Sequence, residues 1–149
     1  MVTVSRTARC SSDAVLAVLA DGWSYATWVV GTARIRAVDP QWPAPGSRVL
    51  HSVGLWPALL DDETVVRAWD PEGSIELQAR GWPAGEARVR ISVAADGSGS
   101  GCTLRMTEDA DKGPGTLVPR PLRSAVIAPR NKETLRRLVL LAERRAPSS

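Results

Sequence analysis

The chain has 149 residues, of which 44% are hydrophobic and 23% charged, proportions typical of one folded domain with a single core. Its formal net charge is +3, and every basic residue except Lys112 and Lys132 is an arginine. The arginines are spread along the sequence and form no basic stripe, so we expect no nucleic-acid partner.

The first ten residues, MVTVSRTARC, contain no apolar signal core. No apolar run approaches the ~18 residues that a membrane-spanning helix needs, so we expect no stable membrane insertion and a cytoplasmic location. Cys10 and Cys102 have no metal-ligand spacing, and a reducing compartment favours free thiols. They come close together if the first and last strands pair antiparallel. We expect neither a metal nor a cofactor.

A strand, a short helix and an aromatic cluster open the chain. Alternation predicts the strand over Val2–Ala8, and Ser11 or Ser12 can cap a helix over Asp13–Ala20. Three large aromatic side chains then follow within six residues: Trp23, Tyr25 and Trp28. Such a cluster favours a packed corner or the wall of a cavity.

From Trp28 onward the hydrophobic period changes from that of a helix to that of a strand. Gly- and Pro-rich turns separate the alternating segments. The predicted strands cover about Trp28–Val38, Ser47–Leu55, Leu60–Trp69, Ser74–Trp82 and Glu86–Ala94, with a last strand that begins at Cys102.

A break over Asp109–Pro121 precedes one long helix, which is predicted to begin between Leu117 and Leu122 and to end near Arg145. Pro129 lies inside this span and is expected to kink it. An apolar stripe with helical spacing consists of Leu135, Leu138, Val139 and Ala142.

These elements predict an α+β fold, in which a curved antiparallel sheet of about seven strands wraps around the long C-terminal helix. Strands with one apolar face need a cover, and the last helix is the only large element available to supply it. We expect one domain over residues 1–145 and a frayed tail over residues 146–149. A cavity between sheet and helix is the expected place for a ligand.

Four segments carry a resemblance to a known family: Ala14–Asp21, Tyr25–Gly31, Trp42–Ser47 and Arg130–Leu138. Through them the chain resembles the START/SRPBCC superfamily, in its polyketide cyclase/dehydrase and lipid-transport branch, over nearly its whole length. The resemblance implies a helix-grip (START-like) fold with a hydrophobic cavity. It also implies a carrier of lipids, polyketides or hormones, a cyclase or dehydratase, or a protein partner. The family has no common catalytic motif to transfer.

His51, the only histidine, shares its strand parity with Val49, Val53 and Leu55. If that face is inward, its imidazole can hydrogen-bond a ligand carbonyl or phenol, or it can be a polar core residue satisfied locally. Tyr25 can offer its hydroxyl to a bound group, or it can pack between helix and sheet. These two residues are the candidates for moving a proton.

The charged candidates have simpler alternatives. Asp61–Glu63 is an acidic cluster that we interpret as a solvated turn. Glu76 and Glu108 are assigned to the polar faces of their strands, with no catalytic role. Arg123 and Arg130 can reach a carboxylate or ketone at the cavity mouth, or they can be solvated surface.

We expect the chain to bind a small hydrophobic molecule, such as a polyketide, an aromatic or a lipid-like metabolite. The expected lining consists of Trp28, Val30, Ile35, Val49, His51, Val53, Leu77, Val89, Ile91, Leu104, Leu122 and Val126. One alternative is an aromatase/cyclase or dehydratase that folds a polyketide-type substrate and uses His51 or Tyr25 to move a proton. The further alternative is a module that binds a protein partner, and a homodimer is compatible with all three.

Inward polar groups within hydrogen-bond reach of each other would favour an enzyme, whereas His51 alone among apolar neighbours would favour a carrier. A filled interior with an exposed apolar patch would favour a partner module.

Overall fold

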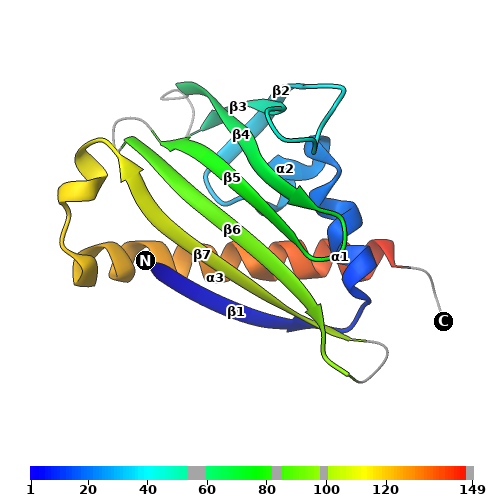
Figure 1. Ribbon diagram of the computed structural model, residues 1–149. Helices are drawn as coiled ribbons and strands as arrows, with labels where there is room; N and C mark the ends of the chain where they lie inside the picture. The colour runs from blue at the N-terminus through cyan, green and yellow to red at the C-terminus, as the bar shows by residue number, and fades with distance from the viewer. Residues whose placement is uncertain (54–59, 82–84, 98–100, 147–149) are drawn as a thin grey trace.

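The computed structural model describes residues 1–53, 60–81, 85–97 and 101–146 (Figure 1). Seven strands form one antiparallel sheet in the order β1-β7-β6-β5-β4-β3-β2. They are β1 (Val2–Ala8), β2 (Thr32–Val38), β3 (Arg48–Val53), β4 (Leu60–Asp70), β5 (Ser74–Gly81), β6 (Gly85–Ala95) and β7 (Cys102–Lys112). The sheet is therefore a meander whose first strand is added beside its last.

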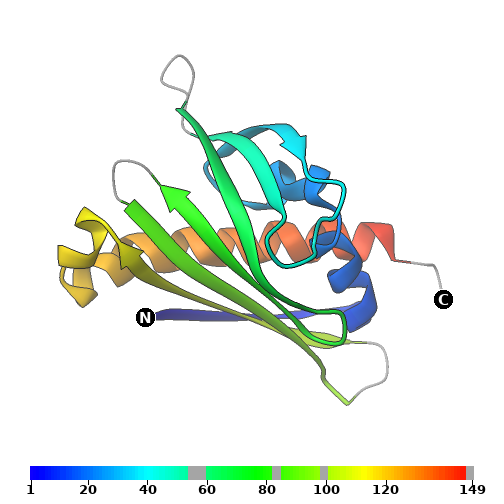
Figure 2. The same cartoon turned by 45° about the horizontal axis from the view of Figure 1, so that its top comes forward.

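The helix α3 (Arg120–Arg145) runs across one face of the curved sheet, as Figures 1 and 2 show. Its buried side chains include the predicted apolar stripe of Leu135, Leu138, Val139 and Ala142. The helix packs against β1 and against the two N-terminal helices α1 (Ser12–Leu19) and α2 (Tyr25–Trp28). The predicted α+β fold, a curved antiparallel sheet around a C-terminal helix, is confirmed.

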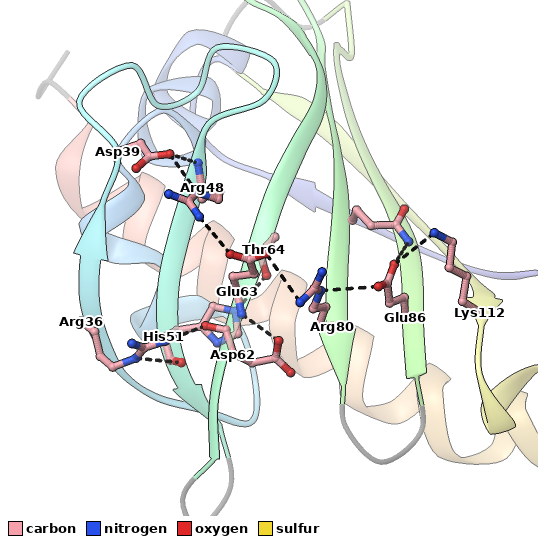
Figure 3. Close-up of polar contacts among 11 residues, drawn as sticks. Arg36, Asp39, Arg48, His51, Asp62, Glu63, Thr64, Arg80, Glu86 and Lys112 are labelled. Atoms are coloured by element: carbon pink, nitrogen blue, oxygen red, sulfur yellow. Dashed lines mark hydrogen bonds and ion pairs between the residues drawn. The ribbon is translucent and has the colours of Figure 1, made fainter.

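Alternation along each strand separates the core from the solvent. On β6, Val89, Ile91 and Val93 are buried in the core. The opposite face of the sheet carries charges of alternating sign, which Figure 3 shows as a ladder across neighbouring strands. Its ion pairs span 3.4 to 4.0 Å and join Asp39, Arg48, Glu63, Arg80, Glu86 and Lys112. Such solvent-facing pairs add little stability each, so the buried face supplies most of the driving force.

Local capping explains where α1 begins. The Ser11 hydroxyl accepts a hydrogen bond from the amide of Ala14 at 3.2 Å, which makes Ser11 the N-cap. The Asp21 carboxylate accepts from the amide of Trp23 and caps a short 3₁₀ helix η1 (Gly22–Ser24). Two short helical segments, η1 and then α2, therefore follow α1 before the sheet continues.

The predicted start of the second strand at Trp28 is wrong. Trp28 ends α2, because the amide of Val29 donates to the carbonyl of Tyr25 at 2.9 Å and closes a helical turn. Gly31 then adopts φ of +97°, a left-handed conformation that favours glycine, and β2 begins at Thr32. The aromatic cluster is thus helical, with Tyr25 and Trp28 in the core and Trp23 exposed.

The predicted strand Leu60–Trp69 is confirmed as β4, so the interpretation of Asp61–Glu63 as a solvated turn is wrong, and the start of the predicted break at Asp109 is also part of a strand. Asp61–Glu63 belongs to β4, since Asp62 pairs with His51 and Glu63 with Leu50 across the β3–β4 ladder. β7 continues to Lys112, which pairs with Glu86 on β6. A short 3₁₀ helix η2 (Pro114–Leu117) then leads to α3. Both departures arise because cross-strand pairing extends strands through locally polar sequence.

Cys102 pairs with Ala8 across the antiparallel β1–β7 ladder, and Cys10 lies two residues further on. Both thiols are free and buried, and they lie close enough to affect each other's pKa. No helix in the described part of the chain is both long and apolar enough to cross a membrane. The predicted strand positions Leu55 and Trp82 and tail residues 147–149 lie outside the described residues.

Candidate functional site: two adjoining hollows between the sheet and the last helix

The first hollow, here called the inner cavity, has a volume of about 190 Å³. Its apolar wall comes from α2 and from strands β5, β6 and β7. The apolar side chains that line it include Trp28, Val29, Val30, Leu77, Val89, Ile91 and Met106. Its polar lining includes Tyr25, His51, Thr64, Glu108, Arg130, Asn131 and Thr134. The inner cavity therefore combines an apolar wall with a set of polar side chains that could orient a ligand.

Three of these polar side chains form a continuous hydrogen-bonded chain. The Tyr25 hydroxyl lies 2.9 Å from Thr64 Oγ1, and His51 Nε2 lies 2.9 Å from the same oxygen. Tyr25, His51 and Thr64 are 4%, 2% and 0% exposed, so this chain is shielded from water. They come from α2, β3 and β4, and the β3–β4 pairing brings His51 and Thr64 together (Figure 3).

Aromatic stacking fixes the orientation of the same groups. The Tyr25 and His51 rings stack with centroids 5.3 Å apart and an interplanar angle of 15°. The Tyr25 and Trp28 rings meet edge to face at 5.4 Å. Trp28 Nε1 and His51 Nδ1 are buried and have no hydrogen-bond partner among the described residues. Both nitrogens belong to residues that line the inner cavity.

Burial sets the protonation of both candidate groups. It lowers the pKa of His51 from 6.5, with Arg36 acting in the same direction and with Asp62 and Glu63 opposing it. The imidazole is therefore neutral at pH 7. Burial also raises the pKa of Tyr25 to about 12, although its hydrogen bond to Thr64 opposes that rise. The site holds a neutral imidazole and a protonated phenol, which can accept and donate a proton respectively.

Glu108 forms a second polar cluster, and its assignment to a polar strand face is wrong. It is 6% exposed, and it shares its parity with Cys102, Leu104 and Met106, which are all buried. Its carboxylate accepts from Arg130 Nη2 at 2.6 and 2.8 Å and from Asn131 Nδ2 at 3.3 Å.

Arg130 therefore binds a carboxylate of this chain rather than standing free at the cavity mouth. Arg123 lies 3.7 Å from the carboxylate of Asp109 in another ion pair.

The second hollow, here called the outer groove, adjoins the inner cavity and has a volume of about 370 Å³. Ala79, Arg80, Glu108 and Arg130 line both hollows. The outer groove also runs along the N-terminal half of α3, where Leu122 and Val126 are 61% and 72% exposed. The Glu108–Arg130 pair thus lies where the two hollows adjoin.

The residues expected to form a lining fall into separate places. Six contribute to the inner cavity: Trp28, Val30, His51, Leu77, Val89 and Ile91. Leu122 and Val126 line the outer groove instead. Val49 and Leu104 are 0% exposed within the core and, like Ile35, line neither hollow. The Val53 side chain lies outside the described residues. Alternation identifies the inward face of a strand but not the position of a hollow along it, which explains this division.

Thr64 and Glu108 are the functional candidates that sequence reasoning missed. Glu108 follows three inward residues at a spacing of two, so its parity alone indicates an inward position. Thr64 has no local signal, since its role depends on contacts with two distant elements. Trp23, in contrast, is 62% exposed and lines neither hollow. In the described part of the chain, no three His, Cys, Asp or Glu side chains cluster as a metal site.

Known structures share this arrangement. The aromatase/cyclase Zhui from Streptomyces sp. R1128 superposes with a TM-score of 0.70 at 19% identity, over 97% of this chain and 93% of that one. A START superfamily protein from Mycobacterium smegmatis gives 0.71 at 15% identity, over 96% and 97%. The di-domain aromatase/cyclase StfQ of the steffimycin biosynthetic pathway gives 0.70 at 11% identity, over 97% of this chain and 45% of that one. These likenesses show the START-like helix-grip fold.

A search of curated proteins finds no match to the sequence. A sequence model of the family described as "Polyketide cyclase / dehydrase and lipid transport", however, matches residues 1–143. Because that match spans nearly the whole chain, the protein belongs to the polyketide cyclase/dehydrase and lipid-transport family, as its resemblance to the START/SRPBCC superfamily predicted.

Proposed function

We propose that this protein binds a small, mainly apolar molecule in the inner cavity. The observation that carries the proposal is the hollow of about 190 Å³ between the sheet and α3, which has an apolar wall and a short chain of buried polar groups. Removal of apolar surface from water would supply the driving force, at roughly 25 cal/mol per Å². The polar chain would orient the ligand.

The volume supports a ligand of limited size. An apolar cavity of about 150 Å³ can hold benzene, so a hollow of about 190 Å³ has room for one ring with a small substituent. A larger polyketide, aromatic or lipid-like metabolite would extend into the outer groove, where the exposed side chains of Leu122 and Val126 offer an apolar surface.

Native mass spectrometry of the gently purified protein, repeated after denaturation, tests this proposal. We expect a small molecule that is bound in the native protein and released on denaturation. In parallel, added cumene (isopropylbenzene) should bind the wild type but bind Val89→Phe at least tenfold more weakly, because the larger ring fills the inner cavity.

Leu122→Ser is the matched control, since Leu122 lines only the outer groove. Equal binding of cumene to wild type and Val89→Phe would contradict a site in the inner cavity.

An aromatase/cyclase or dehydratase is the second candidate, and the hydrogen-bonded chain of Tyr25, Thr64 and His51 favours it. A protonated phenol can donate to a carbonyl or departing oxygen, while a neutral imidazole can accept a proton. Turnover of a polyketide-type substrate should then fall about 10²-fold or more in Tyr25→Phe and in His51→Gln. Binding without turnover in the wild type would instead leave the protein a carrier.

A further inference from the structure

Thr64 joins the two candidate groups, and its geometry limits where their protons can lie. We infer that Thr64 is a positioning residue that couples the His51 tautomer to the Tyr25 hydroxyl, so that the inner cavity selects a ring-sized ligand with a carbonyl oxygen. This inference rests on the proposed function, because it assigns the ligand of that same cavity.

The argument starts from the number of protons on Thr64. Its hydroxyl carries one proton, yet its oxygen lies 2.9 Å from both the Tyr25 hydroxyl and His51 Nε2, and it has no further hydrogen bond among the described residues. Thr64 can therefore donate to only one neighbour, and if it accepted from both, its own buried proton would have no acceptor among the described residues. When the Thr64 proton is paired with one of these neighbours, the direction of one bond decides the direction of the next.

In the first arrangement, the Tyr25 hydroxyl donates to Thr64, and Thr64 donates to His51 Nε2. A neutral His51 then carries its proton on Nδ1, which is buried without a partner among the described residues. An unpaired buried N–H is costly. The ligand-free chain can satisfy its two hydroxyl donors only at that cost.

In the second arrangement, His51 Nε2 donates to Thr64, Thr64 donates to the Tyr25 oxygen, and the Tyr25 proton needs an acceptor. A ligand carbonyl beside Tyr25 supplies that acceptor and leaves no donor of the chain unpaired. A hydrocarbon of the same shape cannot do so. The bound carbonyl is therefore expected to stabilise the Nε2–H tautomer of His51 through Thr64.

The sequence makes this coupling directly observable, because the chain has one histidine and one tyrosine. The ¹⁵N chemical shifts of the imidazole distinguish its tautomers and report on His51 alone. Acetophenone and cumene form a matched pair of probes, since they share the ring and nearly the same shape and differ in the carbonyl oxygen. In the wild type, acetophenone should raise the Nε2–H population relative to cumene and bind about fivefold more tightly.

Two substitutions of Thr64 separate coupling from packing. Thr64→Val keeps the side-chain shape and removes the hydroxyl, so acetophenone should no longer change the His51 tautomer, and the cumene affinity of the same variant measures any change in packing. Thr64→Ser keeps the hydroxyl and should restore the tautomer change. Tyr25→Phe should abolish both the tautomer change and the fivefold preference for the ketone.

The outcomes distinguish this inference from the function on which it rests. Binding of both probes with the same His51 tautomer, or an unchanged tautomer response in Thr64→Val, would overturn the coupling and leave the cavity as a binding site. Failure of both probes to bind the wild type would overturn the proposed ligand site and the inference with it.

Discussion

The inner cavity and the outer groove adjoin at the Glu108–Arg130 pair, yet they are built from side chains with opposite roles in the fold. Ile91 in the inner cavity is 0% exposed, whereas Val126 in the outer groove is 72% exposed. The buried lining is part of the core that holds the sheet to α3. The exposed lining lies on the half of α3 that packs least. A substitution in the lining of the inner cavity should therefore change both ligand binding and the stability of the fold. A substitution in the lining of the outer groove should change ligand binding alone.

Truncating one residue in each hollow tests this difference and has the largest expected effect. Ile91→Ala should lower the free energy of unfolding by about 2–5 kcal/mol, because it removes buried methyl groups and enlarges a cavity. Val126→Ala should change it by less than about 0.5 kcal/mol, since the side chain is already in solvent. Urea denaturation of both variants measures these values, and equal losses would remove the distinction between the two hollows.

The boundary between the hollows should have an intermediate effect. Arg130→Gln should cost about 2 kcal/mol of stability, because the buried Glu108 carboxylate would keep only its hydrogen bond to Asn131. Arg136→Gln is the matched control on the same helix, where an exposed pair with Glu133 is lost at a cost below about 0.5 kcal/mol.

Adding Glu108→Gln to Arg130→Gln should recover part of the loss, because no buried charge then remains unpaired. The pair is merely a surface contact if Arg130→Gln and Arg136→Gln cost the same.

The fold was readable from sequence because its signals are local. Alternation on strands, the caps of α1 and the stripe on α3 each involve residues within a few positions of one another. Glu108 was misread although its parity with Met106 was visible, and its partner Arg130 lies on a distant helix. A buried carboxylate is tolerable only with such a partner, so strand periodicity alone cannot justify it.

The candidate site was less readable than the fold. His51 and Tyr25 were identified as single residues, but their link through Thr64 depends on the register between β3 and β4. A shift of one residue in that register would turn Thr64 to the other face. Contacts of this kind join three elements and leave no pattern within any one of them.

His51, the single histidine of the chain, lines the inner cavity and not the outer groove, so the titration of an imidazole acts on the inner cavity. Because the pKa of folded His51 lies below 6.5, the unfolded chain takes up a proton before the folded chain does. The stability that neutral, buried His51 contributes to the folded state is present above pH 6.5. It is lost as the pH falls toward the lower folded pKa, by at most about 1.4 kcal/mol per pH unit.

His51→Gln should therefore lose less stability than the wild type when urea denaturation is repeated at pH 7 and pH 5. Parallel losses in the two proteins would show that the burial of His51, opposed by Asp62 and Glu63 and assisted by Arg36, has no net effect on its titration.

The smallest expected effect concerns the outer groove as a place for the rest of a longer ligand. Hexanophenone extends acetophenone by an apolar chain, which should gain affinity if the ring occupies the inner cavity and the chain lies along Leu122. Leu122→Ser should then weaken hexanophenone binding by about fivefold, as expected for a partial loss of apolar burial, and leave acetophenone binding unchanged.

Leu140→Ser is the control, because Leu140 is 43% exposed on the same helix and lines neither hollow. Calorimetric titration of both ketones against the two variants measures the effect. If Leu122→Ser weakens both ketones alike, the groove acts on the whole site rather than on the extension, and the two hollows are then one site in function.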